Sequence, residues 1–101
     1  MAIRFEWDPR KASDNIRKHG IAFETAARVF MDPLSVTTQD RIENGEYRWQ
    51  TIGSPGGHTL LLVAHTLKED TDRGRPVEII RILSARKANK RERRRYERGA
   101  Y

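Results

Sequence analysis

The sequence predicts a small α+β domain with one antiparallel sheet, two N-terminal helices on one face and a basic helix at the C-terminal end. Three observations lead to this fold class. The chain has 101 residues, which suits a single domain spanning residues 1–101. Apolar residues recur at helical spacing near the N-terminus, and from residue 34 onward they follow the period of two that is typical of strands. The last 16 residues are strongly basic.

The first expected elements are a strand and a helix. Residues 2–7 alternate between apolar and charged side chains, so Ile3 and Phe5 are expected to be buried. Asp8 is a suitable N-cap for a helix over residues 9–19, and Gly20 is a suitable residue to end it. The inner side of this helix is expected to consist of three residues, namely Ala12, Ile16 and His19.

A second short helix is expected within residues 21–33, where Asp32-Pro33 ends it. Four strands follow, at residues 35–41, 46–53, 59–66 and 77–84. Short turns predict antiparallel pairing, and a longer polar loop is expected over residues 67–76. The last two strands are apolar on both faces, so they are expected to be central. Ser84 is the expected N-cap of the final helix, residues 85–98.

The charge of the chain is concentrated at one end. Residues 1–85 hold 12 Lys/Arg and 12 Asp/Glu, whereas residues 86–101 hold 8 Lys/Arg and 2 Glu. The entire formal net charge of +6 therefore lies in the last 16 residues. A local cationic surface of this kind predicts an anionic partner, which could be RNA, DNA or an acidic protein.

Several protein classes are excluded by what the sequence lacks. The chain has no cysteine, which excludes disulfides and thiolate metal sites. It has no apolar run near the roughly 20 residues of a membrane helix and no apolar signal segment, so a cytoplasmic protein is expected. Gly-rich phosphate loops, H-E-x-x-H and G-x-S-x-G are missing, and three scattered histidines do not indicate a zinc site. No cofactor or metal is expected.

Arg81 is unusual because it lies in the middle of an expected central strand. A buried arginine is costly without a partner. Two interpretations stay open. Arg81 forms an ion pair with a carboxylate (Glu78, Glu46 or Glu92), or its face is open to an anionic ligand.

Glu92 is a carboxylate within the basic helix, in line with Ala88 and Tyr96 on the side that should face the sheet. It either forms a salt bridge, with Arg81 or Arg95, or it positions a catalytic arginine or acts as a base. The cations on the outer side are expected to bind RNA or a partner: Lys87, Lys90, Arg91, Arg94 and Arg95.

The remaining polar residues suit metal-free RNA cleavage. That reaction needs a base for the 2′-hydroxyl proton, cations for the charge on phosphorus, and an acid for the leaving 5′-oxygen. His, Lys, Arg and Glu on one surface can supply these groups. Each histidine taken alone is more often structural than catalytic.

Two stretches of the chain resemble BrnT-type toxins of type II toxin–antitoxin systems. The first is FEWDPRKASDNIRKHGIAFETAARVF, which starts at Phe5, and the second is RILSARKANKRERRRY, which starts at Arg81. The intervening segments YRWQTIG and LLLVAHT match as well, so the resemblance covers nearly the whole chain.

This resemblance implies a RelE-like fold and a ribonuclease that arrests translation. It also implies a BrnA-type antitoxin with a ribbon-helix-helix domain, with which the toxin represses its own operon, contacting operator DNA through the antitoxin. The toxin alone is then expected to be monomeric and to form a hetero-oligomer with the antitoxin. Carried over by position, the candidate catalytic residues are Lys18, His19, Arg48, Arg81, Arg86 and Glu92.

Two other functions remain as alternatives. One is a non-catalytic basic RNA- or DNA-binding module, which predicts steep salt dependence of binding without strand cleavage. The other is an interaction protein whose basic helix binds only an acidic partner, and an antitoxin could itself be that partner.

Overall fold

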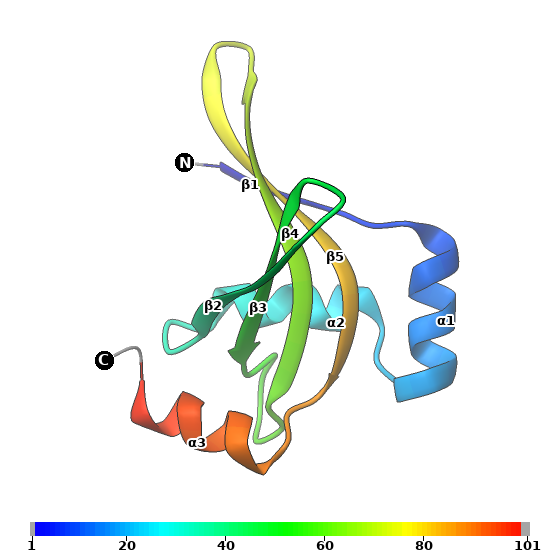
Figure 1. Ribbon diagram of the computed structural model, residues 1–101, viewed down its shortest axis with the longest axis vertical. Helices are drawn as coiled ribbons and strands as arrows, with labels where there is room; N and C mark the ends of the chain where they lie inside the picture. The colour runs from blue at the N-terminus through cyan, green and yellow to red at the C-terminus, as the bar shows by residue number, and fades with distance from the viewer. Residues whose placement is uncertain (1, 100–101) are drawn as a thin grey trace.

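The computed structural model describes residues 2–99 and contains a single five-stranded sheet with the strand order β1-β5-β4-β3-β2. Three α-helices and one 3₁₀ turn surround the sheet (Figure 1). The predicted α+β class is therefore confirmed. Residues 1, 100 and 101, at the two ends of the predicted domain, lie outside the described residues.

Four of the strands form successive antiparallel pairs: β2 (Val36–Glu43), β3 (Glu46–Gly53), β4 (Leu61–Asp72) and β5 (Arg75–Lys87). As predicted, β4 and β5 lie inside the sheet. The prediction of a purely antiparallel sheet was wrong, because β1 (Ala2–Glu6) pairs with β5 in parallel. Short turns fix the direction only of strands that follow each other, and β1 and β5 lie at opposite ends of the chain.

The first helix, α1, runs over Pro9–His19 as predicted, with the Asp8 side chain accepting a hydrogen bond from the Arg10 amide. Its expected inner side was wrong for two of three residues, because Ile16 is 52% exposed and His19 is also exposed, while the buried residue is Asn15. The Asn15 amide bonds both backbone groups of Ala85 and the Ile21 carbonyl. The two bonds with Ala85 thus fix α1 to β5, and the third holds the loop that follows α1.

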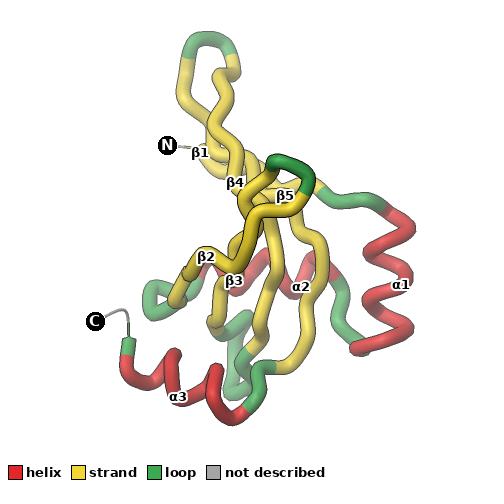
Figure 2. The backbone as a smooth tube through the Cα atoms, viewed as in Figure 1, coloured by secondary structure: helices red, strands yellow, loops and turns green. Residues whose placement is uncertain are grey.

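The core lies between one face of the sheet and the second helical segment, which consists of α2 (Phe23–Ala27) and the 3₁₀ turn η1 (Arg28–Met31). Helical residues Phe23, Ala26 and Val29 pack against strand residues Leu61, Val63, Ile80 and Ile82, all of them buried. Phe5 of β1 packs against this cluster, but Ile3 is 51% exposed, so its predicted burial was wrong. Figure 2 shows these helices behind the sheet.

The polar segment over residues 67–76 is a β-hairpin, so the predicted loop was wrong. Pairing between β4 and β5 continues to Asp72 and Arg75. The turn needs left-handed backbone at Arg73 (φ 53°) and Gly74 (φ 78°), which is typical of two-residue hairpins. This hairpin extends beyond the rest of the sheet at the end away from the C-terminal helix (Figure 1).

The C-terminal helix α3 covers Lys90–Arg98, so the predicted helix over residues 85–98 with Ser84 as N-cap was wrong at its start. Strand β5 continues to Lys87, because β4 pairs with it to that point and Asn15 holds Ala85. The helix is capped instead by Asn89 and Glu92, each accepting a hydrogen bond from the backbone amide of the other.

Candidate functional site

A polar hollow of about 360 Å³ lies on the face of the sheet opposite the core. Across the strands, Gln50 pairs with Ala64, and Ala64 pairs with Ser84, so these three side chains share one face. We call this hollow the cleft. Its lining residues come from α1 and from β2 to β5, and they are Lys11, Asp40, Arg41, Glu43, Arg48, Gln50, Leu62, Ala64, Leu83, Ser84 and Arg86.

Cations outnumber carboxylates in the cleft. Its lining includes the side chains of Lys11, Arg41, Arg48 and Arg86, compared with two carboxylates. A concave surface with excess positive charge attracts anions and can stabilise charge that develops on a phosphate. The cleft therefore suits a phosphodiester substrate.

Arg86 and Glu92 form the best-defined ion pair of the site. The guanidinium donates to both carboxylate oxygens, Nη1 to Oε1 and Nη2 to Oε2, each at 2.9 Å. This hydrogen bonding lowers the pKa of Glu92 and raises that of Arg86. The sequence-based pairing of Glu92 with Arg81 or Arg95 was wrong, because Arg86 on the end of β5 is closer to the helix N-terminus.

A second contact holds the other end of α3. The Tyr96 hydroxyl donates to Asp32 at 2.7 Å, and this bond raises the pKa of Tyr96 to about 12. Burial alone would raise the pKa of Asp32, but hydrogen bonds from the Ser54 amide, Tyr96 and the Leu34 amide lower it overall. The predicted inward orientation of Glu92 and Tyr96 is confirmed, since both are partly buried.

Arg48 lies on β3 within the β2–β3 hairpin, and Arg81 of β5 contacts the tip of that hairpin through Glu46. The Arg48 side chain is only 15% exposed, and its guanidinium lies 3.5 Å from Glu43 and 3.8 Å from Glu46. The Arg81 Nη2 donates to Glu46 at 3.3 Å, which is one of the three ion pairs that the sequence left open. Arg81 is 43% exposed and lines a smaller hollow with Asp8 and Lys11.

Lys18 and His19 lie at the exposed end of α1, outside the cleft. They line a neighbouring hollow that shares Lys11, Leu83 and Ser84 with the cleft. The structure thus places the two residues of the KHG motif beside the cleft rather than in it. A bound polymer that occupies both hollows would contact them together with Arg86.

The cations predicted to bind RNA divide into three groups. Lys90, Arg91 and Arg94 are exposed on α3, as predicted. Arg95 is exposed but donates to Thr38 on β2 at 3.3 Å, so it also connects the helix to the sheet. Lys87 is exposed on β5 and precedes the helix, which corrects its predicted place on the helix.

His65 is a structural residue. Its ring is fully buried, lies edge-on to Phe30 at 4.9 Å, and forms hydrogen bonds with Thr51 Oγ1 (2.7 Å) and the Thr66 carbonyl (3.2 Å). Burial lowers its pKa to about 4. At neutral pH the ring is therefore uncharged and has hydrogen-bonding partners for both nitrogens.

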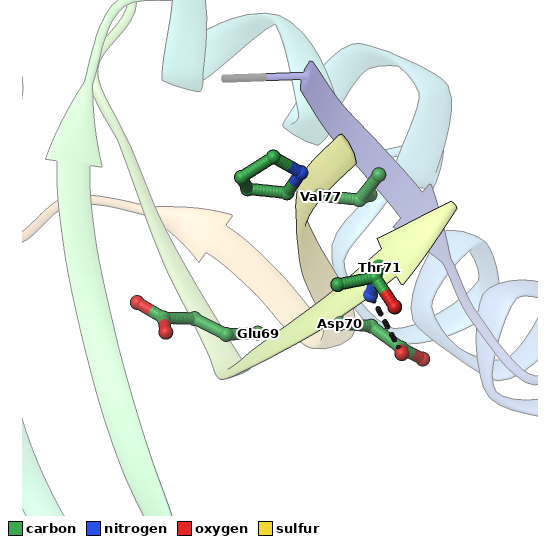
Figure 3. Close-up of a pocket in the computed structure, with 5 residues that line it drawn as sticks. Glu69, Asp70, Thr71 and Val77 are labelled. Atoms are coloured by element: carbon green, nitrogen blue, oxygen red, sulfur yellow. Dashed lines mark hydrogen bonds between the residues drawn. The ribbon is translucent and has the colours of Figure 1, made fainter. Parts of the chain in front are cut away.

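A different hollow lies where the β4–β5 hairpin meets the rest of the sheet (Figure 3). Its lining consists of Glu69, Asp70, Thr71, Pro76 and Val77, and the Asp70 carboxylate accepts a hydrogen bond from the Thr71 amide. The charged residues in this lining are acidic, so it does not suit a nucleic acid. The cleft, at about 360 Å³ compared with about 260 Å³, is both larger and the better candidate.

Two further properties concern the described residues 2–99. None of their helices has the length and apolar character needed to cross a membrane. Within the same range, no group of three or more His, Cys, Asp or Glu residues is placed to hold a metal ion.

Sequence reasoning missed several residues of the site. Lys11 is part of the opening motif, but nothing in the helical pattern indicates that it faces the cleft. Arg41 and Glu43 precede the Asn44-Gly45 turn, and only the folding of that hairpin brings them to Arg48. Local spacing cannot reveal contacts that depend on the position of a hairpin relative to its sheet.

Comparisons with known proteins give a family model and a solved structure that are similar to this chain. The family model of BrnT, described as the ribonuclease toxin of a type II toxin–antitoxin system, matches residues 7–92. A crystal structure of the Brucella abortus ribonuclease toxin BrnT is similar in fold, with a TM-score of 0.56 and 20% sequence identity. The similarity covers 89% of this chain and 100% of that chain. The comparison with curated protein sequences gives no match.

The matched segment includes nearly all of the site, from Trp7 within the opening motif to Glu92. The cations of the cleft, the capped basic helix and the family match lead to one conclusion. This chain belongs to the BrnT family of ribonuclease toxins of type II toxin–antitoxin systems.

Proposed function

We propose that this protein is a metal-independent endoribonuclease that cleaves RNA in the cleft and thereby arrests translation in the cytoplasm. The observation that carries the proposal is that Arg48 of β3 and Arg86 of β5 line one polar hollow, with Lys11 and Arg41 in the same lining. These four cations supply the positive charge that a pentavalent phosphorus requires.

The proposed roles follow from geometry. Arg86 stabilises the charge on the phosphate. Glu92 positions Arg86, because the bidentate pair fixes the plane of the guanidinium. Arg48 is held by carboxylates at longer distance, so its donors can turn to a substrate oxygen. Arg81 binds the RNA backbone at the adjoining hollow.

Proton transfer is proposed for the hollow beside the cleft. His19 is the histidine that can carry out this step, because His65 is buried and His58 lies in the turn after β3. Lys18 contributes positive charge at the same position. The RelE-like relationship implied by the sequence motifs is compatible with this use of side chains alone.

The partner in this proposal is a BrnA-type antitoxin with a ribbon-helix-helix domain. The exposed cations of α3, among them Arg91 and Arg94, provide an electrostatic surface for an acidic segment of that protein. An antitoxin bound there covers the cleft and excludes RNA. The complex then represses its own operon, with DNA contacts made by the antitoxin and the toxin as part of a hetero-oligomer.

The experiment is RNA cleavage by the purified protein in the presence of EDTA, together with growth after induced expression. Cleavage with EDTA, growth arrest, and rescue by co-expression of the proposed BrnA-type antitoxin are the expected results. Binding of RNA without any strand cleavage would favour the non-catalytic binding module instead. Cleavage that EDTA abolishes would contradict the metal-independent chemistry.

A further inference from the structure

Six charged side chains form a connected network at the end of the β2–β3 hairpin, where Asp40 accepts a hydrogen bond from Arg41 Nη1 at 3.2 Å. Arg41 Nη2 lies 3.6 Å from Glu43 Oε2, and Arg48 Nε lies 3.5 Å from the same oxygen. On the other side, Glu46 Oε1 is 3.8 Å from Arg48 Nη2 and 3.3 Å from Arg81 Nη2. Glu43 and Glu46 thus each lie between two guanidinium groups, and Arg48 is common to both.

Arg48 is the most buried cation of this network and its bonding is incomplete. Its Nε is enclosed by protein, and no acceptor among residues 2–99 forms a hydrogen bond with it. The Glu43 oxygen at 3.5 Å is close enough for an ion pair but does not meet the geometry of a hydrogen bond. A buried donor left unpaired is costly, and a better-placed anion would remove this cost.

The two carboxylates are carried by a segment with few connections to the rest of the sheet. Pairing of β3 with β4 ends where Trp49 meets His65, so residues 42–47 extend beyond it. A register shift between Gln39 and Arg41 interrupts the β2–β3 ladder behind them. The tip is joined to β5 by the hydrogen bond from Arg81 to Glu46.

The tip also places like charges directly opposite each other. Glu43 and Glu46 are cross-strand partners beside the Asn44-Gly45 turn, where φ is 53° and 74°. Such a pair is destabilising by itself, so the surrounding arginines are needed to hold it. About 46% of the Glu43 side chain and 45% of the Glu46 side chain is exposed, so either can move into water.

We propose that Arg41, Arg48 and Arg81 form a binding subsite for RNA backbone phosphates, and that Glu43 and Glu46 occupy it in the RNA-free protein. The inference rests on the proposed function, because it assigns this subsite to the RNA substrate. A phosphodiester presents two oxygens that share one negative charge to a guanidinium fork, as a carboxylate does. RNA phosphates therefore replace the two glutamates, and the hairpin tip turns away from the cleft.

The exchange has a measurable consequence for affinity. RNA must displace two bound carboxylates before it can use the three arginines, so the glutamates weaken RNA binding. Their removal should strengthen binding by more than the change in net charge alone can explain. A control with equal charge change is available, because Glu24 on α2 and Glu69 on the β4–β5 hairpin are exposed and lie outside the cleft lining.

The test measures binding of a 2′-O-methyl RNA oligonucleotide, which lacks the 2′-hydroxyl needed for cleavage, by fluorescence anisotropy at fixed salt. Glu43→Gln/Glu46→Gln is expected to bind about tenfold more tightly than Glu24→Gln/Glu69→Gln, which corresponds to about 1.4 kcal/mol. In the first background, Arg41→Gln should weaken binding more than Arg10→Gln does. Equal affinity of the two double variants would overturn the subsite, as would weaker binding by Glu43→Gln/Glu46→Gln.

The two proposals can fail separately. Cleavage of ordinary RNA by the wild-type protein, with equal 2′-O-methyl RNA affinity in both double variants, would leave the ribonuclease function and remove the subsite. Tighter binding by Glu43→Gln/Glu46→Gln, with no cleavage by the wild-type protein, would support the subsite and remove the proposed endoribonuclease activity.

Discussion

Glu92 joins the C-terminal helix to Arg86 through two hydrogen bonds of 2.9 Å, while its Oε1 also accepts the Asn89 amide. One side chain therefore caps α3 and orients an arginine of the cleft. The folding of the basic helix and the geometry of the cleft are coupled through this carboxylate.

The first prediction concerns Glu92→Gln, which should destabilise the protein by about 1–2 kcal/mol, because one capping bond and one charge-assisted pair are weakened. The expected loss of stability is small because the Arg86 side chain is 40% exposed and water screens part of the interaction. Urea denaturation at pH 7 measures the effect. Glu97→Gln, on the exposed side of the same helix, is the matched control, and an equal loss in both variants would contradict the account.

The same pair predicts a pH dependence. Hydrogen bonding to Arg86 lowers the pKa of Glu92 in the folded protein. The contribution of ionised Glu92 to the free energy of unfolding is therefore present above the pKa of the unfolded state and is lost as the pH falls through the pKa of the folded state. The stability difference between wild type and Glu92→Gln should therefore disappear on acidification. A difference that persists at the lowest pH at which both variants fold would show that the charge is not involved.

His65 should limit stability at acidic pH. Its pKa falls from the unfolded value near 6.5 to about 4 on folding, so the unfolded state binds the proton more readily between these values. The contribution of uncharged His65 to the free energy of unfolding is fully present above about pH 6.5. It should decrease by roughly 3 kcal/mol as the pH approaches 4. NMR titration of the His65 ring measures the pKa directly, and a value near 6.5 would contradict its buried, uncharged state.

Tyr96→Phe tests the contact at the other end of α3. Loss of the hydrogen bond to Asp32 should cost about 1 kcal/mol and raise the pKa of Asp32, which keeps its amide bonds to Ser54 and Leu34. In the wild type, one tyrosine should titrate near pH 12 by ultraviolet absorbance, and the stability from this bond should be lost as the pH rises through that value. An unchanged titration curve in Tyr96→Phe would contradict this assignment.

The outer cations of α3 should contribute affinity rather than chemistry. Arg91→Gln/Arg94→Gln should weaken binding of both RNA and antitoxin and reduce the slope of log affinity against log salt by about 2, if each arginine contacts one phosphate. Arg73→Gln/Arg75→Gln, on the distant β4–β5 hairpin, removes equal charge and is the control. Equal effects of the two double variants, measured by salt titration of RNA binding, would show that only net charge matters.

Local patterns predicted most of the fold. Both ends of α1 were predicted to the residue from Asp8, Pro9 and Gly20. Apolar runs identified β4 and β5 as inner strands. The predicted start of α3 was wrong, because Ser84 and Asn89 are both acceptable N-cap residues by local rules. The choice between them depends on Asn15, which lies 70 positions from Ala85 and holds that residue in the strand.

The candidate site was predictable only in part. The motifs indicated Arg48, Arg86 and Glu92, and the structure brings Arg86 and Glu92 into direct contact and Arg48 into the same hollow as Arg86. The partners of Arg48 were not predictable, because they depend on how far the β2–β3 hairpin diverges from β4. That divergence follows from the end of pairing at Trp49 and His65, which no local pattern encodes.

The central claim is that the cleft is the site of RNA cleavage, and cleavage rates of Arg48→Gln and Arg98→Gln test it most directly. Both changes remove one arginine, but Arg48 lines the cleft and Arg98 is exposed at the end of α3. Circular dichroism checks that both variants are folded. The single-turnover rate should then fall about 10²–10³-fold in Arg48→Gln and remain near wild type in Arg98→Gln. Equal rates in the two variants would contradict the claim.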